Sequence, residues 1–197
     1  MKKTITFFLA IISVILLHAQ TPKTTWNLDK AHSSVHFSVA HMVISEVEGK
    51  FTDFNADLKA DKPDFTDANG TFTVALKSVN TDNDKRDEHL RSSDFFDAEK
   101  YPNMTFTIKK FVKVKDKSYK LTGDLTLHGI TKTITLDAKF GGIIKDPYGM
   151  TRTGLKVTGK INRYDFGLKY NKAMEAGGVL IGQNVKININ IELTKAN

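Results

Sequence analysis

The amino-acid sequence predicts an all-β fold in which eight antiparallel strands close into a barrel, with one or two short helices in the loops. Two observations carry this prediction: apolar and polar residues alternate in segment after segment, and most of these segments are joined by short turns. Alternation with a period of two is typical of a strand that buries one face. A closed barrel leaves no exposed edge, but a two-sheet sandwich would bury the same faces, so alternation leaves both architectures open.

The alternation is clearest in the last predicted strand, within VKININIELT, where Ile187 and Ile189 share one face while Lys186 and Asn188 share the other. The strand predicted over 48–58 is expected to carry a bulge near Asp53. Phe51 and Phe54 are three residues apart, so they cannot both face inward on a regular strand. Tight turns are predicted at 116–117 and 128–129. The remaining strands are predicted, in chain order, at 34–41, 48–58, 69–79, 104–115, 118–127, 131–141 and 151–163.

Two longer interruptions separate the strands. In the first, TDNDKRDEHLRSSDFFDAEKYPNM, Asn83 or Asp84 would cap a short helix that ends near Leu90, and Ser92 or Ser93 would cap a second turn. The second interruption, RYDFGLKYNKAMEAGGVLIG, is rich in glycine and aromatic residues. Both are expected at the ends of the barrel. No repeat or break in composition divides the chain, which predicts a single domain.

The N-terminal segment is predicted to be a signal peptide spanning 1–19. MKK precedes an apolar run and a cleavage site after Ala19, so the domain would span 20–197 and the protein would be periplasmic or secreted. A cut after Gln20 and an uncleaved anchor are the alternatives left open. The formal net charge is +7 without a run of basic residues, and nucleic acid is therefore not expected as a partner. The absence of cysteine excludes disulfides and thiolate metal sites.

The inward faces of the strands predict a hydrophobic interior. Small residues occupy inward positions at Gly49, Ala56, Gly123, Ala138 and Gly159. Such residues favour a cavity, but they would equally accommodate strand bending or neighbouring phenylalanine rings in a filled barrel, and both interpretations stay open. The predicted pore lining consists of the apolar inward residues Val35, Phe37, Val39, Phe51, Phe54, Phe72, Val74, Leu76, Phe106, Ile108, Leu121, Leu125, Leu136, Phe140, Leu155, Val157, Ile187 and Ile189.

Several blocks of the sequence resemble the YceI-like family, which is named after a bacterial periplasmic protein. They are WNLDKAHSSVHFSVAHMVISEVEGKF, SVNTDNDKRDEHLRSSDFFDAEKYPNMTF, GDLTLHGITKTITLDAKF and INRYDFGL, in family order over residues 26–193. The resemblance implies an extended lipocalin-like barrel whose interior holds a long polyisoprenoid or another amphiphilic lipid chain. It also implies a link to isoprenoid quinone metabolism or a stress response.

The resemblance sets the expected ligands and partners. We expect a bound lipid, whether a polyprenyl chain, an isoprenoid quinone or a fatty-acid-like amphiphile, and no other cofactor. Peripheral membrane contact would allow the lipid to be exchanged. An exposed apolar rim would support a homodimer.

The polar residues near the barrel ends suggest contacts for a lipid head group. His32 and His36 lie four residues apart on a strand, about 13 Å, which is too far to bind one metal ion together, and no metal site is expected. His41 has the opposite parity to these two histidines and lies at the end of its strand. It is expected either as a structural histidine or as a head-group contact at a pocket mouth. Arg91 and Arg163 flank the irregular segments, and their planar guanidinium groups fit a diphosphate or carbonyl head group. The competing and favoured interpretation is structural ion pairing with Asp87, Asp94 or Asp165.

A hydrolase or metal-assisted enzyme is the alternative function. Its candidate acid and base groups are His36, His41, Asp87, Glu88 and His89, which would have to converge in the fold. The competing interpretation is a solvated helical turn with an Asp87 to Arg91 ion pair at spacing four. Because the sequence holds no nucleophile elbow, phosphate-binding loop or HExxH motif, we expect a binding protein rather than an enzyme.

Overall fold

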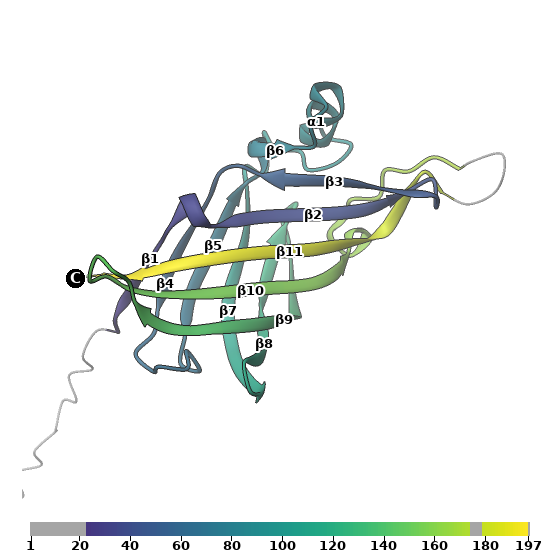
Figure 1. The fold of residues 1–197 in the computed structure, drawn as a ribbon. Helices are drawn as coiled ribbons and strands as arrows, with labels where there is room; N and C mark the ends of the chain where they lie inside the picture. The colour runs from purple at the N-terminus through teal and green to yellow at the C-terminus, as the bar shows by residue number, and fades with distance from the viewer. Residues whose placement is uncertain (1–22, 174–178, 197) are drawn as a thin grey trace, which may run out of the picture.

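The computed structural model describes residues 23–173 and 179–196, and strands dominate this part of the chain (Figure 1). The predicted signal peptide lies outside the described residues. The short helices are α1 (Asp84–Arg91) and the 3-10 turns η1 (Lys30–His32), η2 (Leu76–Ser78) and η3 (Arg163–Phe166). The strands are β1 (Thr25–Leu28), β2 (Ser34–His41), β3 (Ser45–Phe51), β4 (Phe54–Lys59), β5 (Asn69–Ala75), β6 (Val79–Asn80), β7 (Asn103–Lys115), β8 (Ser118–Leu127), β9 (Ile130–Lys145), β10 (Thr151–Asn162) and β11 (Ile181–Lys195).

Eight strands close into an antiparallel barrel, which confirms the predicted fold class and excludes the sandwich. They follow the order β1-β4-β5-β7-β8-β9-β10-β11, and β1 then pairs back onto the end of β11, with Leu28 opposite Leu193. The neighbouring half of β11 pairs instead with β2, where Phe37 lies opposite Ile187, and β3 and β6 extend the sheet from there. β1 was not predicted, because four residues are too few to show alternation.

The prediction of one bulged strand over 48–58 was wrong. Phe51 ends β3 and lies opposite Val35 of β2, whereas Phe54 begins β4 and lies opposite Val74 of β5. Both phenylalanine side chains are buried. The chain therefore turns a corner at Asp53, between two strands with different partners, and this corner explains the break in parity.

The turns and the helix largely follow their sequence signals. His128 and Gly129 both have positive φ angles, 52° and 73°, as the tight turn between β8 and β9 requires. The side chain of Asn83 caps α1 by accepting a hydrogen bond from the backbone N–H of Arg86 at 3.0 Å. The segment that begins at Ser92 forms turns, as its sequence predicts, and the hydroxyl oxygen of Ser92 accepts a hydrogen bond from the backbone N–H of Asp94 at 3.3 Å. Within the described part of the chain, no helix has both the length and the hydrophobicity needed to cross a bilayer.

An aromatic cluster closes one end of the barrel. Trp26 packs on Phe65 with ring centroids 4.9 Å apart, and Phe65 packs on Phe140 at 5.2 Å. Phe111 and Tyr119 stack nearly parallel at 4.5 Å, and Tyr119 also meets Phe140 at 5.8 Å. All of these side chains are buried. We call this set of rings the aromatic plug.

Candidate functional site: the interior cavity

A cavity of about 390 Å³ lies inside the barrel. Its walls come from strands around the whole barrel and are almost entirely hydrophobic. Binding sites for small molecules span roughly 300–1,000 Å³, so the space is large enough to hold a ligand. The cavity contradicts the alternative of a barrel filled by its own side chains.

Several inward side chains are only half-buried, although they point to the barrel interior. Phe72, Phe106, Ile108, Leu155 and Ile189 all line the cavity and all have intermediate exposure. A side chain in a close-packed interior would be surrounded by other atoms on every side. Their partial exposure shows that these side chains face open space inside the barrel.

Three of the residues predicted to line the pore belong to the packed core instead. Phe54 packs against Phe72 at 5.8 Å, Leu76 is fully buried on η2 rather than on a strand, and Phe140 is part of the aromatic plug. The remaining predicted residues do line the cavity: Val35, Phe37, Val39, Phe51, Phe72, Val74, Phe106, Ile108, Leu121, Leu125, Leu136, Leu155, Val157, Ile187 and Ile189.

The inward glycines do not create this cavity, because large side chains fill the space beside them. A Cβ atom added to Gly49 would lie 2.4 Å from Cζ of Phe37, and one added to Gly159 would lie 2.4 Å from Cδ2 of Leu136. Gly123 leaves room for a phenylalanine ring in the same way. The structure therefore supports the second interpretation of these glycines, in which they leave room for large neighbouring side chains.

Opposite the aromatic plug, the cavity is lined by residues of the β2–β3 hairpin, of α1, and of the segments 163–170 and 180–181. Figure 1 shows where the hairpin and α1 lie on the barrel. The lining side chains here include His41, Arg86, His89 and Tyr170, and each is partly exposed. Because the rings at the other end are buried, the cavity reaches the surface at this end. We call it the mouth. Its polar side chains can meet a head group while the walls contact an apolar chain.

His89 is held at the mouth by aromatic and acidic neighbours. Its ring meets Phe95 at 5.0 Å and Tyr170 at 4.8 Å, both edge to face. Its Nε2 lies 2.8 Å from Oδ2 of Asp94. Sequence reasoning missed Phe95 and Tyr170 as cavity-lining residues, because they lie in irregular segments that show no alternation.

Arg163, for which the sequence left a head-group contact and a structural ion pair open, lines the cavity, and its guanidinium group binds backbone carbonyl oxygens. Its side chain is buried, and burial lowers the pKa of the guanidinium group. The guanidinium donates hydrogen bonds to the backbone carbonyl oxygens of Leu168 at 2.5 Å, Tyr170 and Gly182 at 2.9 Å, and Ile181 at 3.2 Å. Arg163 therefore joins the segment after η3 to the start of β11 and is already occupied by protein partners.

Arg91, the other arginine predicted at the head group, does not line the cavity. Its Nη1 donates to the carbonyl oxygen of Lys77 at 3.5 Å. The expected pairing with Asp87 is also wrong, because Asp87 is buried and accepts hydrogen bonds from the N–H and hydroxyl of Thr81 at 2.9 and 2.6 Å. Arg86, earlier on α1, does line the cavity at the mouth.

The residues of the alternative enzyme are not assembled into one site. His41 and His89 both lie at the mouth. His36 borders the cavity between Val35 and Phe37, but the residue is exposed on β2. Glu88 is exposed, and the buried carboxylate of Asp87 is engaged by Thr81 as described above. The carboxylate that reaches His89 is that of Asp94, which was not in the predicted set.

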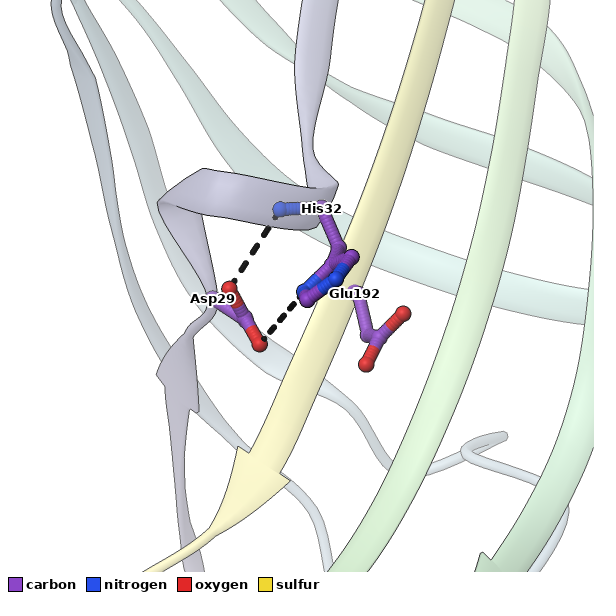
Figure 2. Close-up of side chains that lie close together, drawn as sticks. All are labelled: Asp29, His32 and Glu192. Atoms are coloured by element: carbon purple, nitrogen blue, oxygen red, sulfur yellow. Dashed lines mark hydrogen bonds and ion pairs between the residues drawn. The ribbon is translucent and has the colours of Figure 1, made fainter.

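A separate cluster of possible metal ligands lies on the outside of the barrel. Figure 2 shows Asp29 and His32 at η1 beside Glu192 on β11, and one ligand atom from each lies within 4.8 Å of the others. Nδ1 of His32 is 3.0 Å from Oδ2 of Asp29. By ligand type and spacing alone, this group fits a divalent cation.

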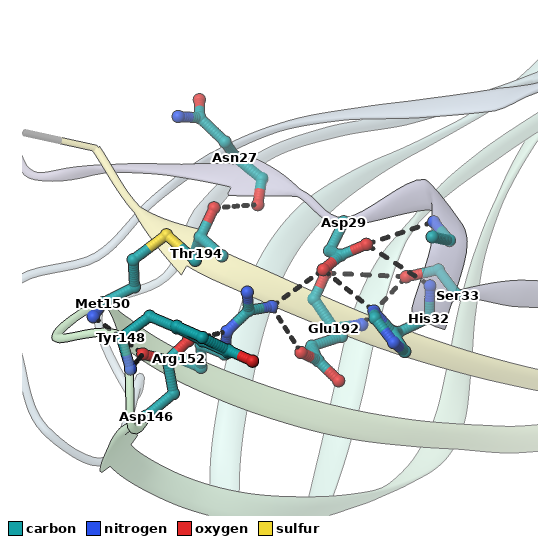
Figure 3. A network of polar contacts seen from close by, with 11 residues as sticks. Asn27, Asp29, His32, Ser33, Asp146, Tyr148, Met150, Arg152, Glu192 and Thr194 are labelled. Carbon is teal, nitrogen blue, oxygen red and sulfur yellow. Dashed lines mark hydrogen bonds and ion pairs between the residues drawn. The ribbon is translucent and has the colours of Figure 1, made fainter.

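A guanidinium group already neutralises this cluster (Figure 3). Nη1 of Arg152 donates to Asp29 at 2.8 Å and to Glu192 at 2.7 Å, while its Nε donates to Asp146 at 2.6 Å. The hydrogen bond from Arg152, supported by His32, lowers the pKa of Asp29 to about 2. A metal ion would have to displace this cation, so the cluster serves as an ion-pair network that ties η1 to β10, β11 and the β9–β10 turn.

Comparisons with known proteins agree with the geometry. The family model described as the YceI-like domain matches residues 26–193. A UPF0312 protein of Staphylococcus aureus is 40% identical over 172 residues, which are 87% of this chain and 98% of that protein. The crystal structure of a Campylobacter jejuni YceI protein is 38% identical, has a TM-score of 0.70, and is matched over 86% of this chain and 97% of that one.

A more distant solved structure shares the fold. It is a polyisoprenoid-binding domain from Saccharophagus degradans, which is 17% identical with a TM-score of 0.65. The match covers 88% of this chain and all of that one, 100%.

Proposed function

Since the chain belongs to the family of YceI-like domain proteins, we propose that it is an exported binding protein that holds a long-chain polyisoprenoid, or a similar amphiphilic lipid, in its barrel. The observation that carries this proposal is the hydrophobic cavity of about 390 Å³ with polar side chains at its mouth. The fold shared with a polyisoprenoid-binding domain supports the same class of ligand.

The cavity sets how such a ligand would be bound. The apolar chain extends inward toward the aromatic plug, and the head group stays near His41, Arg86, His89 and Tyr170 at the mouth. Burial of one five-carbon isoprene unit contributes about 4 kcal/mol, at about 0.8 kcal/mol per carbon group, before the costs of immobilisation. The walls therefore supply most of the affinity, and the polar groups orient the ligand.

The cellular role follows from the export prediction. With 1–19 as a signal peptide, the mature protein is periplasmic or secreted and sequesters or transports the lipid through water, linked to isoprenoid quinone metabolism or a stress response. The lipid is its ligand and no other cofactor is required. Exchange of the lipid takes place by peripheral contact with a membrane.

The binding role is tested by ligand recovery and by a variant that blocks the cavity. Native mass spectrometry and organic extraction of the purified protein should yield a bound isoprenoid-type lipid. Leu155→Trp places a large ring in the cavity and should abolish uptake of farnesyl and longer prenyl chains. Lys156→Trp, at an exposed position of the same strand, should leave uptake unchanged. A protein free of ligand that also takes up no prenyl chain would contradict the proposal.

The enzymatic alternative has its own test. His41→Ala and His89→Ala remove the two histidines that lie at the mouth. We expect neither variant to change the amount of bound metal or any hydrolytic activity against lipid esters. An activity of the wild-type protein that both substitutions abolish would favour the enzyme over the binding protein.

A further inference from the structure

The turn between β2 and β3 exposes an unusual run of hydrophobic side chains. Met42, Val43 and Ile44 are 39%, 75% and 84% exposed, respectively. We call these three residues the hairpin tip. Isolated exposed hydrophobic residues are common, but three in succession at the end of a hairpin are a concentrated apolar surface.

The backbone of the hairpin tip does not explain this choice of residues. Met42 and Val43 have positive φ angles of 49° and 66°, and the N–H of Ile44 donates to the carbonyl oxygen of His41 at 3.3 Å. Such turns favour asparagine and glycine, and a β-branched residue is strained at positive φ. A residue type that its own backbone conformation disfavours indicates a functional constraint at that position.

The hairpin tip borders the mouth of the cavity. Ala40 and His41, the residues immediately before it, line the cavity, and so does Leu180. The backbone N–H of Met42 donates to the carbonyl oxygen of Leu180 at 2.9 Å, which fixes the hairpin tip beside the chain segment that enters β11. The apolar surface of the cavity thus continues onto an apolar surface outside the barrel.

Size and charge indicate which partner this surface fits. Three side chains at a convex turn supply far less area than the roughly 800 Å² per partner of a stable protein interface. They do suit penetration into the boundary between lipid head groups and acyl chains. Without Lys2 and Lys3 of the predicted signal peptide, 27 lysine and arginine residues (29 − 2) remain against 22 aspartate and glutamate residues, an excess that attracts anionic lipid surfaces. Near the hairpin tip, the negative charge of Glu46 is balanced by its ion pair with Lys186.

We propose that the hairpin tip inserts into the surface of an anionic phospholipid membrane and brings the mouth of the cavity against the lipid layer. This inference rests on the proposed function, because it supplies the route by which a lipid chain passes between bilayer and barrel. In this position, the chain moves from one apolar environment to the other with little exposure to water.

Vesicle binding by matched variants tests this proposal. The double variant Val43→Asp and Ile44→Asp removes the apolar surface and adds negative charge at the hairpin tip. We expect it to bind vesicles of phosphatidylethanolamine and phosphatidylglycerol at least tenfold more weakly than the wild type, while uptake of a soluble prenyl chain is unchanged. The matched control is Ile144→Asp, because Ile144 is 62% exposed on β9 at the opposite end of the barrel. The control should bind vesicles as the wild type does.

Several outcomes would overturn the proposal. They are a wild-type protein that does not bind these vesicles, a double variant that binds them normally, and a control that is weakened equally. Light scattering provides a further check: a dimeric wild type whose double variant is monomeric would show that the hairpin tip docks a second copy instead. If the wild type binds vesicles through the hairpin tip but takes up no prenyl chain, the proposed function fails and the membrane contact stands.

Discussion

At the scale of single residues, Arg152 controls the ionisation of the carboxylates around it. Its guanidinium hydrogen-bonds to Asp29 and Asp146, and these contacts lower the pKa of both groups, to about 2 for Asp29. A carboxyl group whose pKa is lower in the folded than in the unfolded protein stabilises the fold when it is charged. For Asp29, this stabilisation is fully present above its ordinary pKa of 3.8 and is lost as the pH falls through about 2.

The first prediction follows from the lowered pKa of Asp29 in the folded protein. Asp29→Asn should lower the free energy of unfolding at neutral pH, and the difference from the wild type should shrink as the pH falls from 3.8 toward about 2. Urea unfolding over this pH range measures the difference. Asp57→Asn, at an exposed position of β4, serves as the control and should have little effect. A difference that stays constant across the range would show that Arg152 does not act through the charge of Asp29.

A second prediction concerns the close approach of a glycine to a cavity wall. In Gly159→Ala, the new Cβ would meet Cδ2 of Leu136 at 2.4 Å, so this flexible side chain should move into the cavity. Prenyl-chain affinity should fall about fourfold for each methylene-sized group that is excluded, at about 0.8 kcal/mol per group. Gly154→Ala, on the same strand, is the control, because its Cβ would find its nearest neighbour at an ordinary 3.8 Å. Equal affinities for the two variants in titrations would refute this account of the wall.

At the scale of elements, the short strand β1 completes the barrel. It pairs with β4 on one side and β11 on the other, and Trp26 fastens it. The indole Nε1 donates to the carbonyl oxygen of Ala60 at 3.1 Å, while the ring packs on Phe65 in the aromatic plug. The closed end of the cavity therefore depends on a strand of four residues.

The third prediction tests this element. Trp26→Ala should reduce the free energy of unfolding by about 3–5 kcal/mol, since it removes a large buried side chain. Trp26→Phe keeps most of the ring packing and should cost less, chiefly through the lost hydrogen bond to Ala60, about 1 kcal/mol. Asn27→Ala, at an exposed position of the same strand, provides the control for denaturant unfolding. If Trp26→Ala lowered the free energy of unfolding no more than Asn27→Ala does, β1 would not be needed to close the barrel.

The strands also show how much of the fold could be predicted from the sequence. Alternation located the long strands, but it could not separate β3 from β4, because Phe51 and Phe54 are inward on both sides of a corner. It assigned Leu76 to the pore, although β5 ends at Ala75 and Leu76 lies on a 3-10 turn. Periodicity describes the faces of a strand and carries no information about where its pairing partner changes.

The candidate site was predictable along its walls and not at its mouth. The walls come from alternating strands, whereas Arg86 and Tyr170 come from irregular or helical segments without that period. The outer ion-pair network was hidden for another reason: Asp29 and Arg152 are 123 residues apart in the chain, and nothing local joins them. Contacts between distant segments become visible only when the register of the sheet is known.

At the scale of the whole molecule, the barrel is a container with one closed and one open end. The aromatic plug closes one end, the hydrophobic walls surround about 390 Å³, and the polar groups gather at the mouth. The ligand that we propose, with a polar head and a long apolar chain, fits this shape. In the proposed membrane contact, the hairpin tip would present the mouth to the lipid layer.

The most direct test of this account is the affinity of the purified protein for a series of prenyl alcohols of increasing chain length, measured by titration calorimetry. Each added isoprene unit should strengthen binding until the cavity is full, because each unit buries more hydrocarbon against the walls. Beyond that length, the affinity should level off. An absence of binding, or an affinity that does not depend on chain length, would contradict the proposal that the barrel holds a lipid chain.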